Sequence, residues 1–216
     1  GYFDRRDYEY QMIPLGIDTK KFVSIPVNES NQFSLVYCGV VSRYHMLDLV
    51  FEVLQELKKR YKKIKLNVIG SGPDVDYFRN LAKKMGLGKN VVFHGFMEDS
   101  TAFRSLMANN ALGLALYKDE ENFMKYTEPA KVKYYLTFGV PAIVSDVPVI
   151  ARELDRKRVC FAVKNDKHEI AEKIEKYILN KSLQKEYREN IKEFIKTIDV
   201  RDLLDKTFKN TPGLNL

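Results

Sequence analysis

Short apolar runs alternate with amphipathic stretches along most of the chain. Leu47, Val50, Leu54, Leu57 and Tyr61 recur at intervals of three or four residues, which predicts a helix with one buried face. The apolar runs on either side are continuous, as expected for strands of a sheet that is covered on both faces. We expect six such strands, at residues 33–38, 65–70, 90–95, 111–117, 141–145 and 158–163.

Further helical patterns lie between and after these strands. One runs from Val75 to Met85 and is expected to end near Gly86 and Gly88, another covers residues 98–109, and three more follow the last strand. Strands that alternate with helices are joined by right-handed crossovers and form a parallel sheet. The sequence therefore predicts an α/β fold, a Rossmann-like doubly wound parallel sheet of about six strands with helices on both faces.

The composition is that of an ordinary globular protein. Hydrophobic residues make up 45% of the 216 positions and charged residues 30%. No apolar run approaches the roughly 20 residues of a membrane-spanning helix. Cys38 and Cys160 lie in apolar runs, so we interpret them as buried thiols in a reducing, cytoplasmic compartment. No metal site is expected, because His45, His94 and His168 are far apart in the sequence.

The net charge of +7 is concentrated in one segment. Residues 58–65, "KKRYKKIK", lie at the end of a predicted helix. Cations are stabilised at the negative end of a helix dipole, so a solvated helix terminus explains them. A peripheral contact with anionic lipid headgroups is the alternative. We expect no nucleic-acid partner, since no recognition motif of aromatic and basic residues accompanies the charge.

Doubly wound sheets bind ligands at the carboxyl ends of their strands, and the residues there exclude two common ligands. Residues 70–75, "GSGPDV", depart from the dinucleotide fingerprint because Val75 replaces its third glycine, and they follow the second strand instead of the first. No Walker-type phosphate loop is present either. The predicted strand ends are Gly39, Gly70, Gly95, Tyr117 and Ser145.

Residues 126–135, "YTEPAKVKYY", are the best candidate for a phosphate site. Thr127 or Glu128 can cap a helix with Pro129 in its first turn, and the free amides of such a helix start bind anions. Lys131 adds a full positive charge, and Glu128 is suited to accept hydrogen bonds from sugar hydroxyls. The alternative is that Glu128 and Lys131 form a surface charge pair.

Several segments resemble, in the same order, those of glycosyltransferases with the GT-B fold, especially the large retaining group called family 4. Residues 13–22, "IPLGIDTKKF", are similar to the family's interdomain connector. Residues 65–97 resemble its "L.IVG.GP" segment, and residues 131–148, "KVKYYLTFGVPAIVSDVP", resemble its "KLFEYLAAGKPVIASD.P" segment. The resemblance runs from about Ile13 to Lys196.

The resemblance implies that this chain is the carboxyl-terminal half of a GT-B fold. It divides the chain into a connector (1–22), a donor-binding domain (23–197) and a crossover helix with a tail (198–216). The donor would be a nucleotide-diphosphate sugar, used without cofactor or metal, and a missing amino-terminal domain would bind a glycan or lipid-linked acceptor. Because the chain begins Gly1-Tyr2, we expect a piece of a longer protein that is inactive alone. The expected setting is bacterial polysaccharide or glycan synthesis, cytoplasmic or peripheral to the inner face of the membrane.

The family's site residues carry over incompletely. Lys131 matches the basic residue that reaches the donor phosphates. Tyr126 and Tyr134 occupy the positions of two glutamates, although Glu128 lies two residues from the first and the Tyr134 phenol is able to bind a ribose. Val40 replaces an arginine that neutralises the diphosphate.

Neighbouring residues complete the expected site. Arg43 and His45 compensate for the missing cations, while His94, Phe96 and Met97 follow the third strand, where the family's nucleobase rests. The alternative for Phe96 is ordinary packing in the core. The alternative for His94 is a histidine whose hydrogen bonds are made within the protein. Gly39, Gly70 and Gly72 permit close backbone approach to a ligand, and the alternative is that a tight turn from strand to helix needs the same freedom. The expected catalytic residues are Glu128 and Lys131, and the expected donor-binding residues are Gly39, Arg43, His45, Gly70, Gly72, His94, Phe96, Met97, Thr127 and Tyr134.

Two other functions stay open on the sequence alone. A nucleotide-sugar epimerase or hydrolase can share the GT-B fold. A degenerate, non-catalytic module that binds a partner protein would account for the replaced glutamate and arginine positions. Retained nucleotide binding separates the enzymes from the module, and transfer to an acceptor separates the transferase from the epimerase.

Overall fold

The computed structural model describes residues 15–22, 24–26, 30–118 and 122–209. The first fourteen residues of the expected connector, and residues 210–216 of the expected tail, lie outside the described residues.

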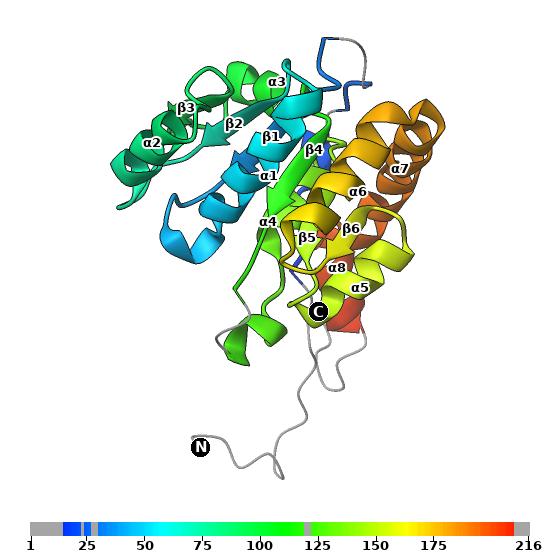
Figure 1. The fold of residues 1–216 in the computed structure, drawn as a ribbon. Coiled ribbons are helices and arrows are strands. Elements are labelled where there is room, and N and C mark those ends of the chain that lie inside the picture. The colour runs from blue at the N-terminus through cyan, green and yellow to red at the C-terminus, as the bar shows by residue number, and fades with distance from the viewer. Residues whose placement is uncertain (1–14, 23, 27–29, 119–121, 210–216) are drawn as a thin grey trace.

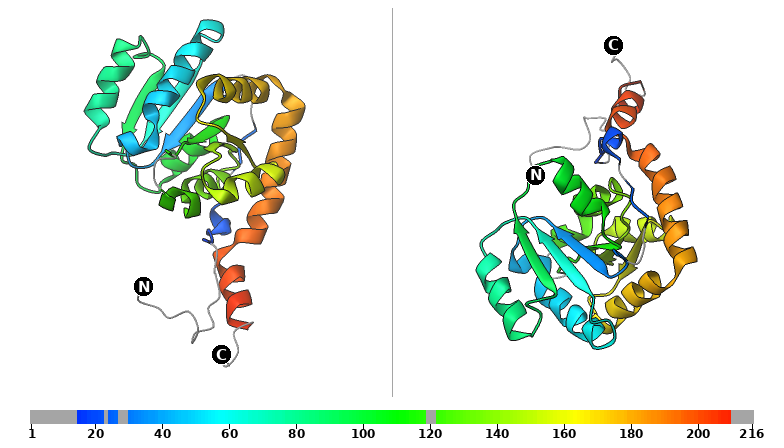
Figure 2. Two further views of the ribbon diagram at one scale, coloured as in Figure 1. Left: turned by 60° about the horizontal axis from the view of Figure 1, so that its bottom comes forward. Right: turned by 90° about the horizontal axis from the view of Figure 1, so that it is seen from above.

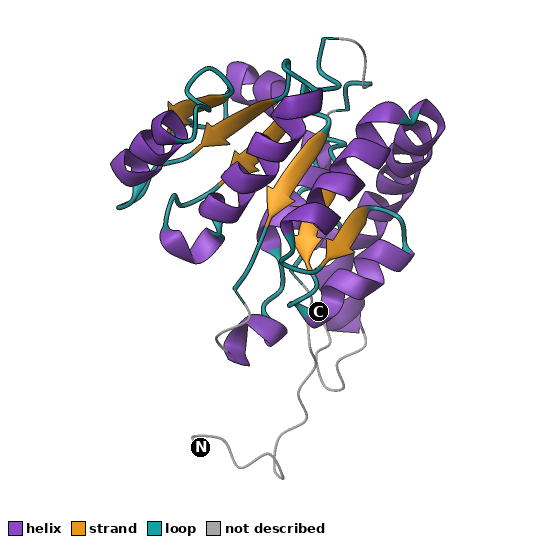
Figure 3. Ribbon diagram, in the orientation of Figure 1, coloured by secondary structure: helices purple, strands orange, loops and turns teal. Residues whose placement is uncertain are grey.

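A six-stranded parallel sheet forms the centre of the molecule (Figures 1 and 3). The strand order is β3-β2-β1-β4-β5-β6, and every neighbouring pair is parallel. The predicted Rossmann-like doubly wound sheet, with its six strands, is therefore confirmed. The strands are β1 (Ser34–Cys38), β2 (Lys65–Ile69), β3 (Val91–Gly95), β4 (Leu112–Ala115), β5 (Ala142–Ser145) and β6 (Cys160–Val163).

Helices cover both faces of this sheet (Figure 2). The α-helices are α1 (Leu47–Arg60), α2 (Val75–Lys84), α3 (Thr101–Ala108), α4 (Ala130–Leu136), α5 (Val149–Arg156), α6 (Lys167–Leu179), α7 (Lys181–Phe194) and α8 (Val200–Lys209). Four short 3₁₀ helices are η1 (Thr19–Lys21), η2 (Arg43–His45), η3 (Asn122–Tyr126) and η4 (Ile195–Ile198). The sequence patterns did not predict α5, an eight-residue helix in which Ala151 and Leu154 are buried.

The core consists of two apolar clusters, one on each face of the sheet. Along β1, Leu35 and Tyr37 point into the cluster under α1, α2 and α6, whereas Val36 points into the cluster under α3, α4 and α5. Successive strand residues face opposite sides, so a strand covered on both sides must be apolar throughout. This double coverage explains the continuous apolar runs in the sequence.

Local signals set several helix boundaries. The side chains of Ser100, Asp166 and Asn180 accept hydrogen bonds from the first-turn amides of α3, α6 and α7. Gly86 follows α2 with a φ of 72°, a left-handed conformation that favours glycine and ends a helix. The expected end of this helix near Gly86 is confirmed.

The two ends of the described chain lie together, away from the sheet (Figure 2). The backbone N of Ile17 donates to the carbonyl of Ile198 over 2.9 Å, and the N of Val200 donates back to Ile17 over 2.9 Å. The connector segment and the start of α8 are therefore paired. Within the described residues, none of the helices has the length and apolar character needed to cross a membrane.

The topological switch point lies between β1 and β4. From β1 the chain proceeds outward to β2 and β3, then returns to place β4 on the other side of β1. Loops that follow these two central strands diverge to opposite faces, which leaves a crevice at their carboxyl ends. A ligand site is therefore expected in this crevice.

Candidate functional site

Lys131 lies at the carboxyl end of β1, where α4 begins. Its Nζ is 4.2 Å from the centre of the Tyr37 ring, and a side chain at Gly39 would come within 3.1 Å of its Cε. This Nζ is enclosed and has no hydrogen-bond partner among the described residues. Burial lowers the pKa of Lys131 to about 8, against a smaller opposing effect of the Cys38 thiol. The strand end thus holds an enclosed cation without a counterion.

His45 provides a second enclosed nitrogen on the same aromatic ring. The centres of the His45 and Tyr37 rings are 6.2 Å apart, and Nδ1 of His45 has no partner among the described residues. Burial, and to a smaller extent the charge of Lys131, lowers the pKa of His45 to about 4, so the imidazole is neutral at pH 7. Buried polar atoms are nearly always hydrogen-bonded, so two unpaired nitrogens in one place point to a ligand with acceptor oxygens.

Tyr135 fixes α4 against the switch point. Its hydroxyl accepts a hydrogen bond from the backbone N of Cys38 in β1 and donates one to the carbonyl of Leu114 in β4, both over 2.9 Å. The ring occupies space left by Gly113, where any side chain would collide with it. Because Lys131 lies one helical turn before Tyr135, this anchor also sets the position of the lysine ammonium.

Glu128 does not cap α4. The N-cap residue is Pro129, without a side-chain hydrogen bond, and the backbone N of Ala130 donates to the carbonyl of Glu128 over 2.7 Å. The amides of Val132 and Lys133 donate to the carbonyl of Pro129. The predicted cap by Thr127 or Glu128, with free amides for an anion, is therefore wrong.

A buried lysine explains this difference. Lys133 is completely buried in α4, and its ammonium forms an ion pair with the Glu128 carboxylate. The alternative expectation of a Glu128–Lys131 charge pair is also wrong, since Glu128 pairs with Lys133. The Thr127 hydroxyl contacts the Met124 sulfur at 3.9 Å.

Two of the predicted glycines make room for the chain itself. A side chain at Gly70 would collide with the carbonyl of Gly39, and one at Gly72 would collide with the backbone of Val41. Gly39 and Gly70 have φ values of 145° and 127°, which other residues rarely adopt. The backbone that approaches Gly70 and Gly72 belongs to the loop after β1, so the alternative expectation, the need of a tight strand-to-helix turn, explains these two glycines.

Arg43 and His94 have partners within the protein. The Arg43 guanidinium is 3.3 Å from the Asp74 carboxylate and 4.2 Å from the centre of the Tyr77 ring, so it is directed towards α2. Nε2 of His94 is 2.9 Å from Oδ1 of Asn67 on the neighbouring strand. His94 is therefore hydrogen-bonded within the protein, as the alternative expectation stated.

The remaining predicted residues are aromatic or apolar. Tyr134 packs against Phe103 and Phe138, with ring centres 6.2 and 5.3 Å away, and burial raises its pKa to about 12. Phe96 is 74% exposed, so core packing does not explain it, whereas Met97 packs against the core. Tyr134 lines a small cavity of about 240 Å³ together with Ile17, Asp18, Asp99, Arg104, Thr137 and Phe138.

The sequence patterns did not single out Tyr37, Tyr135 or Lys133 as site residues. The sequence could have indicated Tyr37, because this residue lies in the first predicted strand, only two residues before the strand-end glycine Gly39. Cys38 and Cys160 are both free thiols. Among the described residues, no three His, Cys, Asp or Glu side chains gather as a metal ion would require.

The fold and the site define a Rossmann-like α/β domain with a candidate anion site at its topological switch point. The chain belongs to the glycosyl transferases group 1, the family whose sequence model matches residues 18–194. The family membership expected from the sequence is confirmed. No curated protein matches the sequence of the chain.

Solved structures share the fold. WaaG, a glycosyltransferase involved in lipopolysaccharide biosynthesis, is 20% identical with a TM-score of 0.73, over 94% of this chain and 56% of WaaG. Anabaena Alr3699/HepE in complex with UDP is 15% identical with a TM-score of 0.70, over 91% of this chain and 56% of that protein. The C-terminal domain of a Francisella tularensis glycosyl transferase group 1 family protein (LpcC) is 19% identical with a TM-score of 0.68, over 84% of this chain and 97% of that domain. This chain thus spans little more than half of the two longer relatives.

Proposed function

We propose that this chain is the donor-binding domain of a glycosyltransferase and that it binds a nucleotide-diphosphate sugar at the carboxyl end of β1. The observation that carries the proposal is the pair of enclosed nitrogens, Nζ of Lys131 and Nδ1 of His45, which both lie near Tyr37 and have no hydrogen-bond partner among the described residues. The oxygens of a diphosphate would accept hydrogen bonds from both nitrogens and supply the missing counter-charge.

The same geometry suits the departure of a nucleoside diphosphate. When the bond between the sugar and the diphosphate breaks, the electron pair goes to the phosphate oxygen. An enclosed ammonium at a fixed position stabilises this growing charge more than water does. His45, neutral at pH 7, adds an N–H donor in its Nδ1-protonated tautomer. Lys131 is therefore the residue to which we assign the largest catalytic effect.

The other predicted residues keep supporting roles in this proposal. The Tyr134 phenol would meet the ribose, and the exposed Phe96 would lie against the base. Glu128 would orient the sugar through a lone pair left over from its contacts with Lys133 and Leu15. An acceptor, a glycan or a lipid-linked glycan, would be bound by a further domain of a longer protein that acts in bacterial polysaccharide or glycan synthesis on the cytoplasmic side of the membrane.

Two relatives support the chemistry. Alr3699/HepE was solved in complex with UDP, and WaaG is involved in lipopolysaccharide biosynthesis. Because this chain spans 56% of each, transfer by the isolated chain is not part of the proposal.

A ligand titration tests the proposal. UDP, GDP, ADP, CDP and NAD would be titrated by ligand-observed NMR, which detects millimolar affinity, against the wild type, Lys131→Ala and Lys164→Ala. Lys164 is an exposed cation just after β6, at the same edge of the sheet, and serves as the charge-matched control. We expect one nucleoside diphosphate to bind, with at least about tenfold weaker binding in Lys131→Ala only. No binding of any of them, or equal loss in both variants, would favour a non-catalytic partner-binding module.

A further inference from the structure

The edge of the sheet opposite the candidate donor site is strongly basic. Three of the turns at this edge join α1 to β2, α2 to β3 and α6 to α7. These turns and the adjoining helix ends carry eleven cations, which we call the basic edge: Lys58, Lys59, Arg60, Lys62, Lys63, Lys65, Lys83, Lys84, Lys89, Lys181 and Lys185.

These cations form one surface because the three helices are neighbours. Figure 1 shows α1 between α2 and α6. The ammonium of Lys58 donates to the carbonyl of Gly86, after α2, over 2.6 Å. Arg60 pairs with Glu175 of α6 at 3.2 Å. The three turns are thus held side by side.

Most of this charge is not neutralised within the protein. Across the part of the chain that the structure describes, the carboxylates that pair with the basic edge are Glu175, with Arg60, and Glu189, 3.8 Å from Lys185. The helix dipole accounts for cations in the last turns of α1 and α2, but Lys62 and Lys63 lie beyond the end of α1. The eleven cations also exceed the net charge of +7, so the rest of the chain is net negative.

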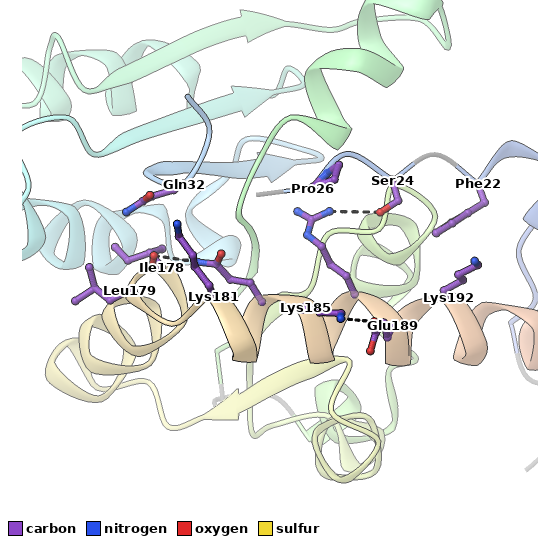
Figure 4. Close-up of a pocket in the computed structure, with 12 residues that line it drawn as sticks. Phe22, Ser24, Pro26, Gln32, Ile178, Leu179, Lys181, Lys185, Glu189 and Lys192 are labelled. Carbon is purple, nitrogen blue, oxygen red and sulfur yellow. Dashed lines mark hydrogen bonds and ion pairs between the residues drawn. The ribbon is translucent and has the colours of Figure 1, made fainter. Parts of the chain in front are cut away.

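An apolar groove begins at the same edge. It runs between α7 and the segment that leads to β1 and has a volume of about 810 Å³. Figure 4 shows Ile178 and Leu179 at the end of the groove near Lys181. The Arg188 guanidinium, which also lines the groove, donates to the Ser24 hydroxyl over 3.5 Å. Leu179 is 55% exposed although it is apolar. The apolar side chains of the groove are Phe22, Pro26, Ile178 and Leu179. Its charged side chains are the cations Lys181, Lys185, Arg188 and Lys192 and one carboxylate, Glu189.

We propose that the basic edge docks this protein on a bilayer with anionic headgroups, and that the groove beside it accommodates apolar parts of the lipid. Lysines on three turns of one edge suit a bilayer surface, where phosphate charges are spread over an area. Each lysine near such a surface adds its own contribution to the binding free energy. The apolar groove next to these cations matches the hydrocarbon just below the headgroups. Docking through this edge leaves the candidate donor site, at the opposite edge, open to solution.

A nucleic acid fits this surface less well. Sequence-tolerant binding of single strands uses aromatic side chains on which bases stack. Tyr61, the aromatic residue of the α1–β2 turn, stacks on Phe33 with ring centres 5.4 Å apart, and its hydroxyl bonds to Glu175. Tyr61 is therefore occupied by contacts within the protein and does not present its ring to a base. The basic edge combines cations with an apolar groove and, among the described residues, it lacks the exposed aromatic rings that such single-strand binders use.

Co-sedimentation with vesicles tests the proposal. The 216-residue chain would be mixed with phosphatidylcholine vesicles, with or without phosphatidylglycerol, over a range of salt concentrations. We expect binding only with phosphatidylglycerol, declining with salt. Because each cation near such a surface changes partitioning about fivefold, Lys62→Glu combined with Lys63→Glu should weaken binding by at least about 25-fold.

A matched control removes the same charge at the other edge. Lys164→Glu combined with Lys167→Glu changes two exposed lysines at the carboxyl edge, and we expect binding within about threefold of the wild type. Leu179→Ser should lower the binding that persists at high salt, because it removes apolar contact but no charge. Equal losses in the two double variants, absence of binding to phosphatidylglycerol vesicles, or equal binding to pure phosphatidylcholine would overturn the proposal. All four lysines are exposed, so thermal unfolding is expected to be unchanged.

Discussion

Glu128 and Lys133 form an ion pair that fastens the connector segment to α4. One oxygen of the Glu128 carboxylate contacts the Lys133 ammonium, and the other accepts a hydrogen bond from the backbone N of Leu15. The ammonium also donates to the carbonyl of Leu15 over 2.6 Å. These contacts hold α4, which carries Lys131, against the segment around Leu15.

This pair should be strongly coupled in stability. Lys133 is completely buried, so Glu128→Gln leaves an ammonium without its counter-charge and should lower the free energy of unfolding by about 3–5 kcal/mol. Glu128→Gln combined with Lys133→Met removes both charges and should cost clearly less. Urea unfolding of the wild type, the single variants and the double variant measures the coupling. Strictly additive losses would show that the two side chains do not act as a pair.

Lys131 should stabilise ligand binding and destabilise the fold. Lys131→Met keeps the length of the side chain but removes an enclosed, unpaired charge, so we expect the free energy of unfolding to rise by roughly 1–3 kcal/mol. The folded-state pKa of Lys131, about 8, lies below its ordinary value of 10.5. The increase in the free energy of unfolding caused by Lys131→Met should therefore be largest below pH 8. It should shrink between pH 8 and 10.5, as the wild-type lysine loses its proton. Thermal and urea unfolding at pH 7 and pH 10 measure this, and an unstable variant at pH 7 would contradict it.

Nucleotide affinity should depend on pH through the same group. A bound diphosphate raises the pKa of Lys131, so binding takes up a proton once the free protein has lost it. We expect the dissociation constant to be flat from pH 7 to 8 and then to rise up to about tenfold per pH unit. The Cys38 thiol, whose pKa burial raises to about 11, stays protonated throughout this range. Titration calorimetry from pH 7 to 9.5 measures the curve, and an affinity that increases above pH 8 would rule out Lys131 as the ligand's cation.

Tyr135 should hold the switch point together through its hydroxyl. Tyr135→Phe leaves the carbonyl of Leu114 and the backbone N of Cys38 without this partner in a buried site, which should cost about 1–3 kcal/mol. Tyr134→Phe, on the exposed side of the same helix, is the matched control and should cost less than about 0.5 kcal/mol. Chemical denaturation compares the two variants. An equal loss in both would mean that the hydroxyl bridge of Tyr135 contributes no more to stability than the exposed hydroxyl of Tyr134.

The sequence determined the secondary structure and the fold. Continuous apolar runs located all six strands, and the three-to-four spacing located α1, α2, α3, α6 and α7. Both signals are local, because whether a residue faces the core depends on its position in its own strand or helix. The short helix α5 was not predicted, although its apolar residues Ile150, Ala151 and Leu154 lie at helical spacing.

The tertiary structure decided which polar groups have partners. Capping rules consider only the residues next to a helix start and so predicted Glu128 as a cap. The actual partner of Glu128 is determined by the burial of Lys133 and by Leu15, 113 positions away in the sequence. Tyr135 likewise bonds to Cys38 across 97 positions.

The sequence by itself therefore identified the family and the sheet, and it placed Lys131 among the candidate site residues. Only the folded chain determined that Lys131 and His45 meet on Tyr37 with unpaired nitrogens, while Arg43, His94, Gly70 and Gly72 are engaged within the protein. The physical reason is that hydrogen-bond satisfaction and desolvation depend on distances between segments remote in sequence. Hydrophobic periodicity carries no information about those distances.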